Sequence, residues 1–180
     1  MRVGSRDASA LLSHSILTIL QPSLITVVLV AFVAGACGPT LGSASACADA
    51  EQQIDTRSFH VIDASEATFE IHPPSSGPHT SYLPEDGLHD EPVAEAVQVA
   101  ALEHGMVVVN FLPGVSAEQS EVLAQLARTS DVVVTPAPDG IDGDANVALT
   151  AWGVRRLCDS LSLVDARSFV REHAGRGAPH

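Results

Sequence analysis

Apolar and polar positions divide the chain into three parts. Residues 24–36 form an apolar run of thirteen residues without a charged or amide side chain. Residues 38–58 are small and polar and show no apolar periodicity, as is typical of a flexible linker. From about Phe59 onward, shorter apolar runs alternate with turns rich in proline and glycine. The pattern therefore predicts an N-terminal signal or anchor over 1–37, a linker over 38–58 and one globular domain over 59–180.

Within that domain, the periodicity predicts strands and helices in alternation. Strands are expected over 67–71, 106–112, 131–135 and 146–152. A capping box, Ser116 with Gln119, starts a helix that runs to Arg128, and Ser162 with Asp165 starts a last helix. Residues 93–101 fit a helix by their alanines and a strand by their alternating valines. The expected fold class is α+β, or small α/β, with a mixed sheet of about four strands and two helices packed on it.

The apolar run near the N-terminus predicts export. Arg2 and Arg6 precede it, and its length suits a signal peptide. It ends in VAGAC, which resembles a bacterial lipoprotein box with Cys37 as the lipidated residue. Release of a secreted domain after Ala46 and an uncleaved single-pass anchor are the alternatives. We expect a domain tethered to the outer face of the cytoplasmic membrane.

The other two cysteines fit an oxidising compartment. Cys47 and Cys158 can form a disulfide that closes a loop of roughly 110 residues. The alternative is a buried free thiol at Cys158, which lies in an apolar stretch, and a mobile Cys47 in the linker. The sequence favours neither, because it does not fix the distance between the two residues.

Charge excludes several classes of function. The chain after residue 37 holds 21 acidic residues against seven arginines, a net charge of −14, and such a surface repels nucleic acid and anionic lipid head groups. The chain contains no lysine, which removes Schiff-base chemistry and the phosphate-binding lysine of a P-loop. We therefore expect no nucleic-acid partner.

Three motifs occur in order in the domain: PPSSGPH at 73–79, LEHG at 102–105 and ALTAWG at 148–153, ahead of Cys158. Over residues 68–180 the chain resembles a bacterial family of exported or membrane-anchored proteins of unknown function. The resemblance implies a fold and an extracytoplasmic address, and no reaction. The family pattern commonly has a histidine where this chain has Ala100, and a Gly-Pro-Glu near the end, where this chain has 178–180 as Ala-Pro-His.

The motifs contain the candidate metal ligands His79, Glu103 and His104, with His72 and His89 as further donors. Imidazole and carboxylate groups suit zinc or copper. In a strand, Glu103 and His104 would point to opposite faces, so LEHG is interpreted as a turn that starts a strand, with His104 at its edge. The alternative is that these imidazoles hydrogen-bond the backbone of a proline-rich loop.

Two hypotheses about function follow. The first is a non-enzymatic cell-envelope protein, whose acidic domain binds a metal ion or a protein partner through the 73–79 loop and the 103–105 segment. The second is a metal-dependent enzyme of the hydrolase type that uses His79, His104 and Glu103. The sequence offers no complete catalytic set, which favours the first.

Overall fold

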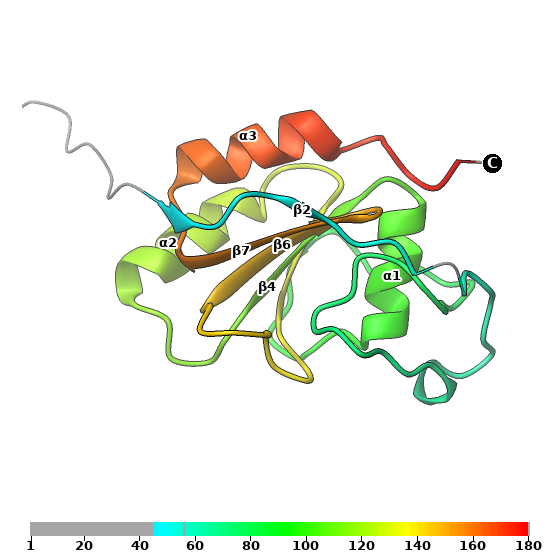
Figure 1. Ribbon diagram of the computed structural model, residues 1–180. Coiled ribbons are helices and arrows are strands. Elements are labelled where there is room, and N and C mark those ends of the chain that lie inside the picture. The colour runs from blue at the N-terminus through cyan, green and yellow to red at the C-terminus, as the bar shows by residue number, and fades with distance from the viewer. Residues whose placement is uncertain (1–44, 56, 180) are drawn as a thin grey trace, which may run out of the picture. The chain divides into compact units, whose positions relative to one another are not determined.

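The computed structural model describes residues 45–55 and 57–179 (Figure 1). A mixed sheet forms the middle layer. Helices α2 (Ala117–Leu126) and α3 (Leu163–His173) pack on one face, and α1 (Glu95–Glu103) packs on the other. The helices thus enclose the central strands between two layers.

The sheet has the strand order β1-β7-β6-β4-β5-β3, and β2 also pairs with β7. A crossover through α2 makes β4 and β5 parallel, and β3 is parallel to β5, whereas β6 pairs antiparallel with both β4 and β7. The strands are β1 (Ala46–Cys47), β2 (Glu51–Gln52), β3 (Gly87–Leu88), β4 (Val107–Phe111), β5 (Val132–Pro136), β6 (Val147–Ala151) and β7 (Val154–Ser160).

Alternation along the central strands builds two hydrophobic cores. Val107 and Val109 of β4 point to the α2 and α3 side, where they meet Leu126 and Phe169. Val108 between them points to the α1 side and packs with Leu102. Successive side chains of a strand face opposite sides of the sheet, and both sides are covered, so the run of valines is fully buried.

The α+β class agrees with the structure, but the expected number of elements was too small. The described residues form three α-helices and seven strands. Strands β1, β2 and β3 have two residues each, which is too short to show periodicity. In β7 the charged residues Arg155, Arg156 and Asp159 hide the strand pattern. The strand expected over 67–71 is wrong, because that segment is irregular.

The predicted linker contributes to the folded domain from Ala46 onward. Strands β1 and β2 pair with β7, and a disulfide joins Cys47 to Cys158, with Cα atoms 3.9 Å apart. The buried guanidinium of Arg155 on β7 also pairs with Glu51 at 2.8 Å. The boundary expected at residue 58 is therefore wrong for the described part of this segment. Its polar composition gave no indication of the two short strands at the edge of the sheet.

The LEHG segment ends a helix. Helix α1 runs to Glu103, and the backbone N–H of His104 donates to the carbonyl of Ala100. Gly105 follows with φ of +84°, a conformation that favours glycine and allows the chain to leave the helix. The interpretation of LEHG as the start of a strand is wrong, because β4 begins only at Val107. Residues 95–102 are all buried, so α1 has no polar face that would identify it as a helix.

The predicted signal or anchor over 1–37, including Cys37, lies outside the described residues. Among the helices that the structure does describe, none combines the length and apolar character that a bilayer span needs.

Candidate functional site

His79 is the most buried of the candidate ligands, with 1% of its surface exposed. It ends the proline-rich 73–79 loop, whose residues are buried throughout. Its Nδ1 lies 2.8 Å from the carbonyl oxygen of Gly77. A carbonyl only accepts hydrogen bonds, so Nδ1 carries a proton, and in the neutral form of this ring the lone pair lies on Nε2. This arrangement is typical of histidines that bind metals, whose second nitrogen donates to a backbone or carboxylate oxygen.

Glu103, at the end of α1, faces that lone pair. Its Oε2 lies 2.8 Å from Nε2 of His79, a distance suited to an ion pair. The contact lies outside hydrogen-bond geometry, however, and Nε2 has no hydrogen-bond partner among the described residues. A neutral imidazole lone pair and a carboxylate repel each other, so this approach requires a positive charge between them or on the ring.

His60 provides the third donor. The backbone of His79 exchanges hydrogen bonds with the 59–61 segment, since its N–H donates to Phe59 and its carbonyl accepts from Val61. This pairing brings the His60 ring to 4.7 Å from the His79 ring, centroid to centroid, and its Nε2 to 4.0 Å from Oε2 of Glu103. The side chain of His60 is 64% exposed, so this side of the site is open to solvent.

The three residues fit a transition-metal ion. One ligand atom from each of His60, His79 and Glu103 lies within 4.8 Å of the other two. Ligands of a tetrahedral ion with bonds of about 2.0–2.1 Å lie about 3.3 Å apart. Binding therefore requires the exposed His60 ring to move closer to Glu103, now 4.0 Å away, and His79 and Glu103, now 2.8 Å apart, to separate slightly. Two imidazoles and one carboxylate form a set that binds zinc and other first-row metals and leaves further positions for water or another ligand.

The backbone of Glu103 is held by the C-terminal segment. Its carbonyl accepts a hydrogen bond from the N–H of Ala178 at 3.0 Å, and the N–H of Gly175 donates to Gly105 at 2.8 Å. The end of α1 is thus fixed where it presents the Glu103 carboxylate. On the other side, Trp152 meets the ring of His79 edge-on, with centroids 6.3 Å apart.

The structure brings His79 and Glu103 together and separates the other predicted ligands from them. His104 is exposed at the C-cap of α1, because one residue along a helix turns the side chain by about 100°. His89 contacts the carbonyl of Glu85 through its Nε2, 2.8 Å away. Neither residue belongs to the cluster of His60, His79 and Glu103.

His72 belongs to a second cluster, with Glu95 and Asp139. Its Nδ1 lies 2.9 and 3.0 Å from the two carboxylate oxygens of Glu95, which is 5% exposed. Burial raises the pKa of Glu95 to about 7, against the opposing effect of His72. Burial lowers the pKa of His72, but the hydrogen bond and charge of Glu95 outweigh it and raise that pKa. This contact is a partly buried pair that joins the residue before the 73–79 loop to the start of α1.

His60 is the candidate ligand that the sequence did not indicate. It lies outside the three motifs, nineteen residues before His79, in a segment without recognisable periodicity. Only the backbone bridge between His60 and His79 brings it to the site. A parallel bridge between two irregular segments leaves no signal in the spacing of residues.

Comparison with known proteins gives one family. Residues 60–180 match the family described as "Protein of unknown function (DUF3105)", and this range includes all three residues of the site. No curated protein and no solved structure matches the chain. The match covers more than half of the chain and agrees with the resemblance seen in its motifs, so the protein belongs to the DUF3105 family.

Proposed function

We propose that this protein is a non-enzymatic cell-envelope protein whose acidic domain binds a divalent transition-metal ion, zinc or copper, through His60, His79 and Glu103. The observation that carries the proposal is the Nε2 atom of His79, which is buried, faces a carboxylate oxygen at 2.8 Å and lacks a hydrogen-bond partner among the described residues. A bound cation removes the repulsion between the two groups and satisfies the lone pair.

Charge and composition support the same proposal. The net charge of −14 after residue 37 attracts cations to the domain surface. Imidazole ligands select transition metals over calcium and magnesium, which prefer sites built from oxygen alone. The exposed side of the site, at His60, gives an ion a path to exchange with solvent.

The proposed address is the outer face of the cytoplasmic membrane, with the domain held by lipid on Cys37 or by an uncleaved anchor. The support comes from the apolar run over 24–36 and its VAGAC ending. The disulfide between Cys47 and Cys158 also suits an oxidising compartment.

The test is elemental analysis and zinc or copper titration of the full chain, purified without a tag in detergent. We expect one ion per chain in the wild type, and loss of binding in His79→Ala and Glu103→Gln. His104→Ala is the matched control, because its imidazole directly follows Glu103 in the chain and is exposed. Binding should therefore remain in that variant.

Two outcomes would reject the proposal. The first is the absence of bound metal in the wild type even after incubation with zinc and copper, which would make the His79 and Glu103 contact an imidazolium–carboxylate pair. The second is equal loss of binding in His79→Ala and His104→Ala, which would point to unspecific surface binding.

A further inference from the structure

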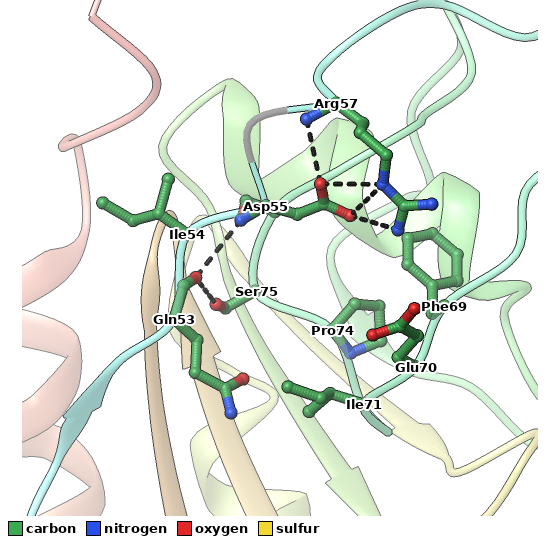
Figure 2. Close-up of a pocket in the computed structure, with 10 residues that line it drawn as sticks. Gln53, Ile54, Asp55, Arg57, Phe69, Glu70, Ile71, Pro74 and Ser75 are labelled. Atoms are coloured by element: carbon green, nitrogen blue, oxygen red, sulfur yellow. Dashed lines mark hydrogen bonds and ion pairs between the residues drawn. The ribbon is translucent and has the colours of Figure 1, made fainter.

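A cleft separate from the metal ligands lies between the segment that follows β2 and the irregular segment 69–71. It has a volume of about 510 Å³, within the range of ligand pockets. Figure 2 shows Gln53, Asp55 and Arg57 along one side, and Phe69, Glu70 and Pro74 along the other.

The cleft is open to solvent, and apolar side chains form part of its lining. Ile54 is 67% exposed and Ile71 is 37% exposed, and both line the cleft together with Phe69 and Pro74. Exposed apolar residues that gather at one concave place are typical of a binding site, whereas singly scattered ones are not.

Hydrogen bonds connect residues 53–55 of the cleft wall to the 73–79 loop. The hydroxyl group of Ser75 donates to the carbonyl of Gln53 at 2.6 Å, and the N–H of Asp55 donates to the hydroxyl group of Ser76 at 2.6 Å. Ser75 and Ser76 are both buried. A preformed wall lowers the entropic cost of binding, because the protein does not have to become ordered around its ligand.

The charged side chains at the rim of the cleft favour a cationic ligand. The guanidinium of Arg57 is occupied by a bidentate contact with Asp55, at 2.6 to 3.1 Å. The carboxylate of Glu70 has neither a hydrogen-bond partner nor an ion-pair partner within 4.0 Å among the described residues. The rim therefore offers a negative charge beside an apolar floor, and it attracts a cation that is attached to an apolar group.

We propose that this cleft binds a segment of a partner protein in which a large apolar side chain is adjacent to an arginine or lysine. The apolar side chain packs against Phe69 and Ile71, and the cationic group pairs with Glu70. An anionic lipid surface is disfavoured by the net charge of −14, whereas the same charge steers a basic segment toward the domain.

The inference does not depend on the metal site. The test is fluorescence anisotropy of the full chain in detergent and EDTA, with three labelled peptides of sequence KFKFK, KSKSK and EFEFE. KFKFK should bind about tenfold more tightly than either of the others, because KSKSK lacks the apolar anchors and EFEFE carries the wrong charge. KFKFK should bind the wild type equally in EDTA and with added zinc, which separates failure here from failure of the metal proposal.

The variants Ile71→Ser and Glu70→Lys should each weaken the binding of KFKFK about fivefold or more. Both side chains are at the surface, so both variants should fold, which a circular dichroism melt checks. Val164→Ser is the control, because Val164 is another exposed aliphatic residue, 76% exposed on α3, and does not line the cleft. It should bind the peptide unchanged.

Several results would overturn the proposal. Equal binding of KFKFK and KSKSK, or no effect of Ile71→Ser and Glu70→Lys, would mean unspecific attraction by an acidic surface. Equal binding of KFKFK and EFEFE, with competition by phosphatidylcholine vesicles, would assign the cleft to lipid. Dimers in sedimentation that Ile71→Ser dissociates would assign it to a second copy of this chain. Absence of binding by all three peptides would also reject it.

Discussion

His72 and Glu95 form a partly buried pair in which one imidazole nitrogen lies 2.9 and 3.0 Å from the two oxygens of the carboxylate. The pKa of Glu95 is raised by burial to about 7, and that of His72 is raised overall by Glu95, although burial opposes this. Between pH 4.5 and about 7 the folded state therefore binds more protons at this pair than the unfolded state does. Its contribution to stability is present at low pH and is lost as the pH rises through this window.

Glu95→Gln should remove this dependence. The amide stays neutral and still accepts a hydrogen bond from His72. Between pH 5 and 7 the free energy of unfolding should therefore fall in both proteins, and the fall in the variant should be smaller than that in the wild type by about 1 to 3 kcal/mol. Urea unfolding at a series of pH values measures this. Glu118→Gln is the control, since Glu118 also lies in the first turn of a helix, α2, but is exposed. Parallel curves for wild type and Glu95→Gln would contradict the prediction.

The disulfide should make a large contribution to stability. It joins Cys47 to Cys158 across a separation of 111 residues and holds β1 on β7. Cys47→Ala should lower the free energy of unfolding by about 2–5 kcal/mol, because the unfolded chain regains the entropy of an open loop. Chemical denaturation with and without dithiothreitol measures this. The reductant should destabilise the wild type to the level of Cys47→Ala and leave the variant unchanged. If the reductant destabilised both proteins equally, its effect would not come from the disulfide.

Copper binding should quench the fluorescence of the chain's single tryptophan. Trp152 meets the His79 ring edge-on at 6.3 Å, so a paramagnetic Cu²⁺ ion on Nε2 would lie close to the indole. Titration with Cu²⁺ should quench the emission and saturate at one equivalent, whereas Zn²⁺ should bind without comparable quenching. The effect should vanish in His79→Ala and persist in His104→Ala. Quenching that survives in His79→Ala would place the copper elsewhere.

The core strands could be predicted from the sequence because burial on both sides of a sheet leaves an unbroken apolar run. Val107, Val132 and Val147 all lie in such runs, each bounded by turn residues, and each proved to start a strand. The helix N-caps at Ser116 and Ser162 could be predicted as well, because the cap depends on residues only three positions apart. The apolar runs and the N-caps both depend only on residues that are close together in the sequence.

The parts that were missed depend on distant contacts. Arg155 is buried in β7 because Glu51 and Asp142 neutralise it, and neither partner is near it in sequence. In the same way, His79 and Glu103 could be named from their motifs, but His60 reaches them only through a backbone bridge. His104 was a candidate because it lies beside Glu103 in the LEHG motif, but the end of helix α1 leaves its side chain exposed.

The C-terminal segment should be necessary for the position of Glu103, and Gly177 provides the test. A Cβ atom at this position would overlap the carbonyl oxygen of Glu103 and would lie 3.0 Å from the N atom of Gly105, both of which are backbone and cannot rotate away. Gly177→Ala should therefore displace the segment from α1 and break the hydrogen bond between Ala178 and Glu103. We expect a loss of about 1 to 3 kcal/mol in stability and weaker zinc binding.

Gly114→Ala separates this effect from the general cost of replacing a glycine. Gly114 has φ of +90° and no heavy atom within 4 Å of an added Cβ, so the substitution should cost about 1 kcal/mol of backbone strain and leave zinc affinity unchanged. Urea unfolding and zinc titration of both variants measure the two effects separately. If Gly177→Ala lost stability but kept the zinc affinity of the wild type, α1 alone would position the carboxylate, and the C-terminal segment would serve only the fold. If zinc binding is weaker in Gly177→Ala and unchanged in Gly114→Ala, the C-terminal segment and the ion stabilise the same end of α1. Metal binding should then in turn protect residues 175–178 from proteolysis.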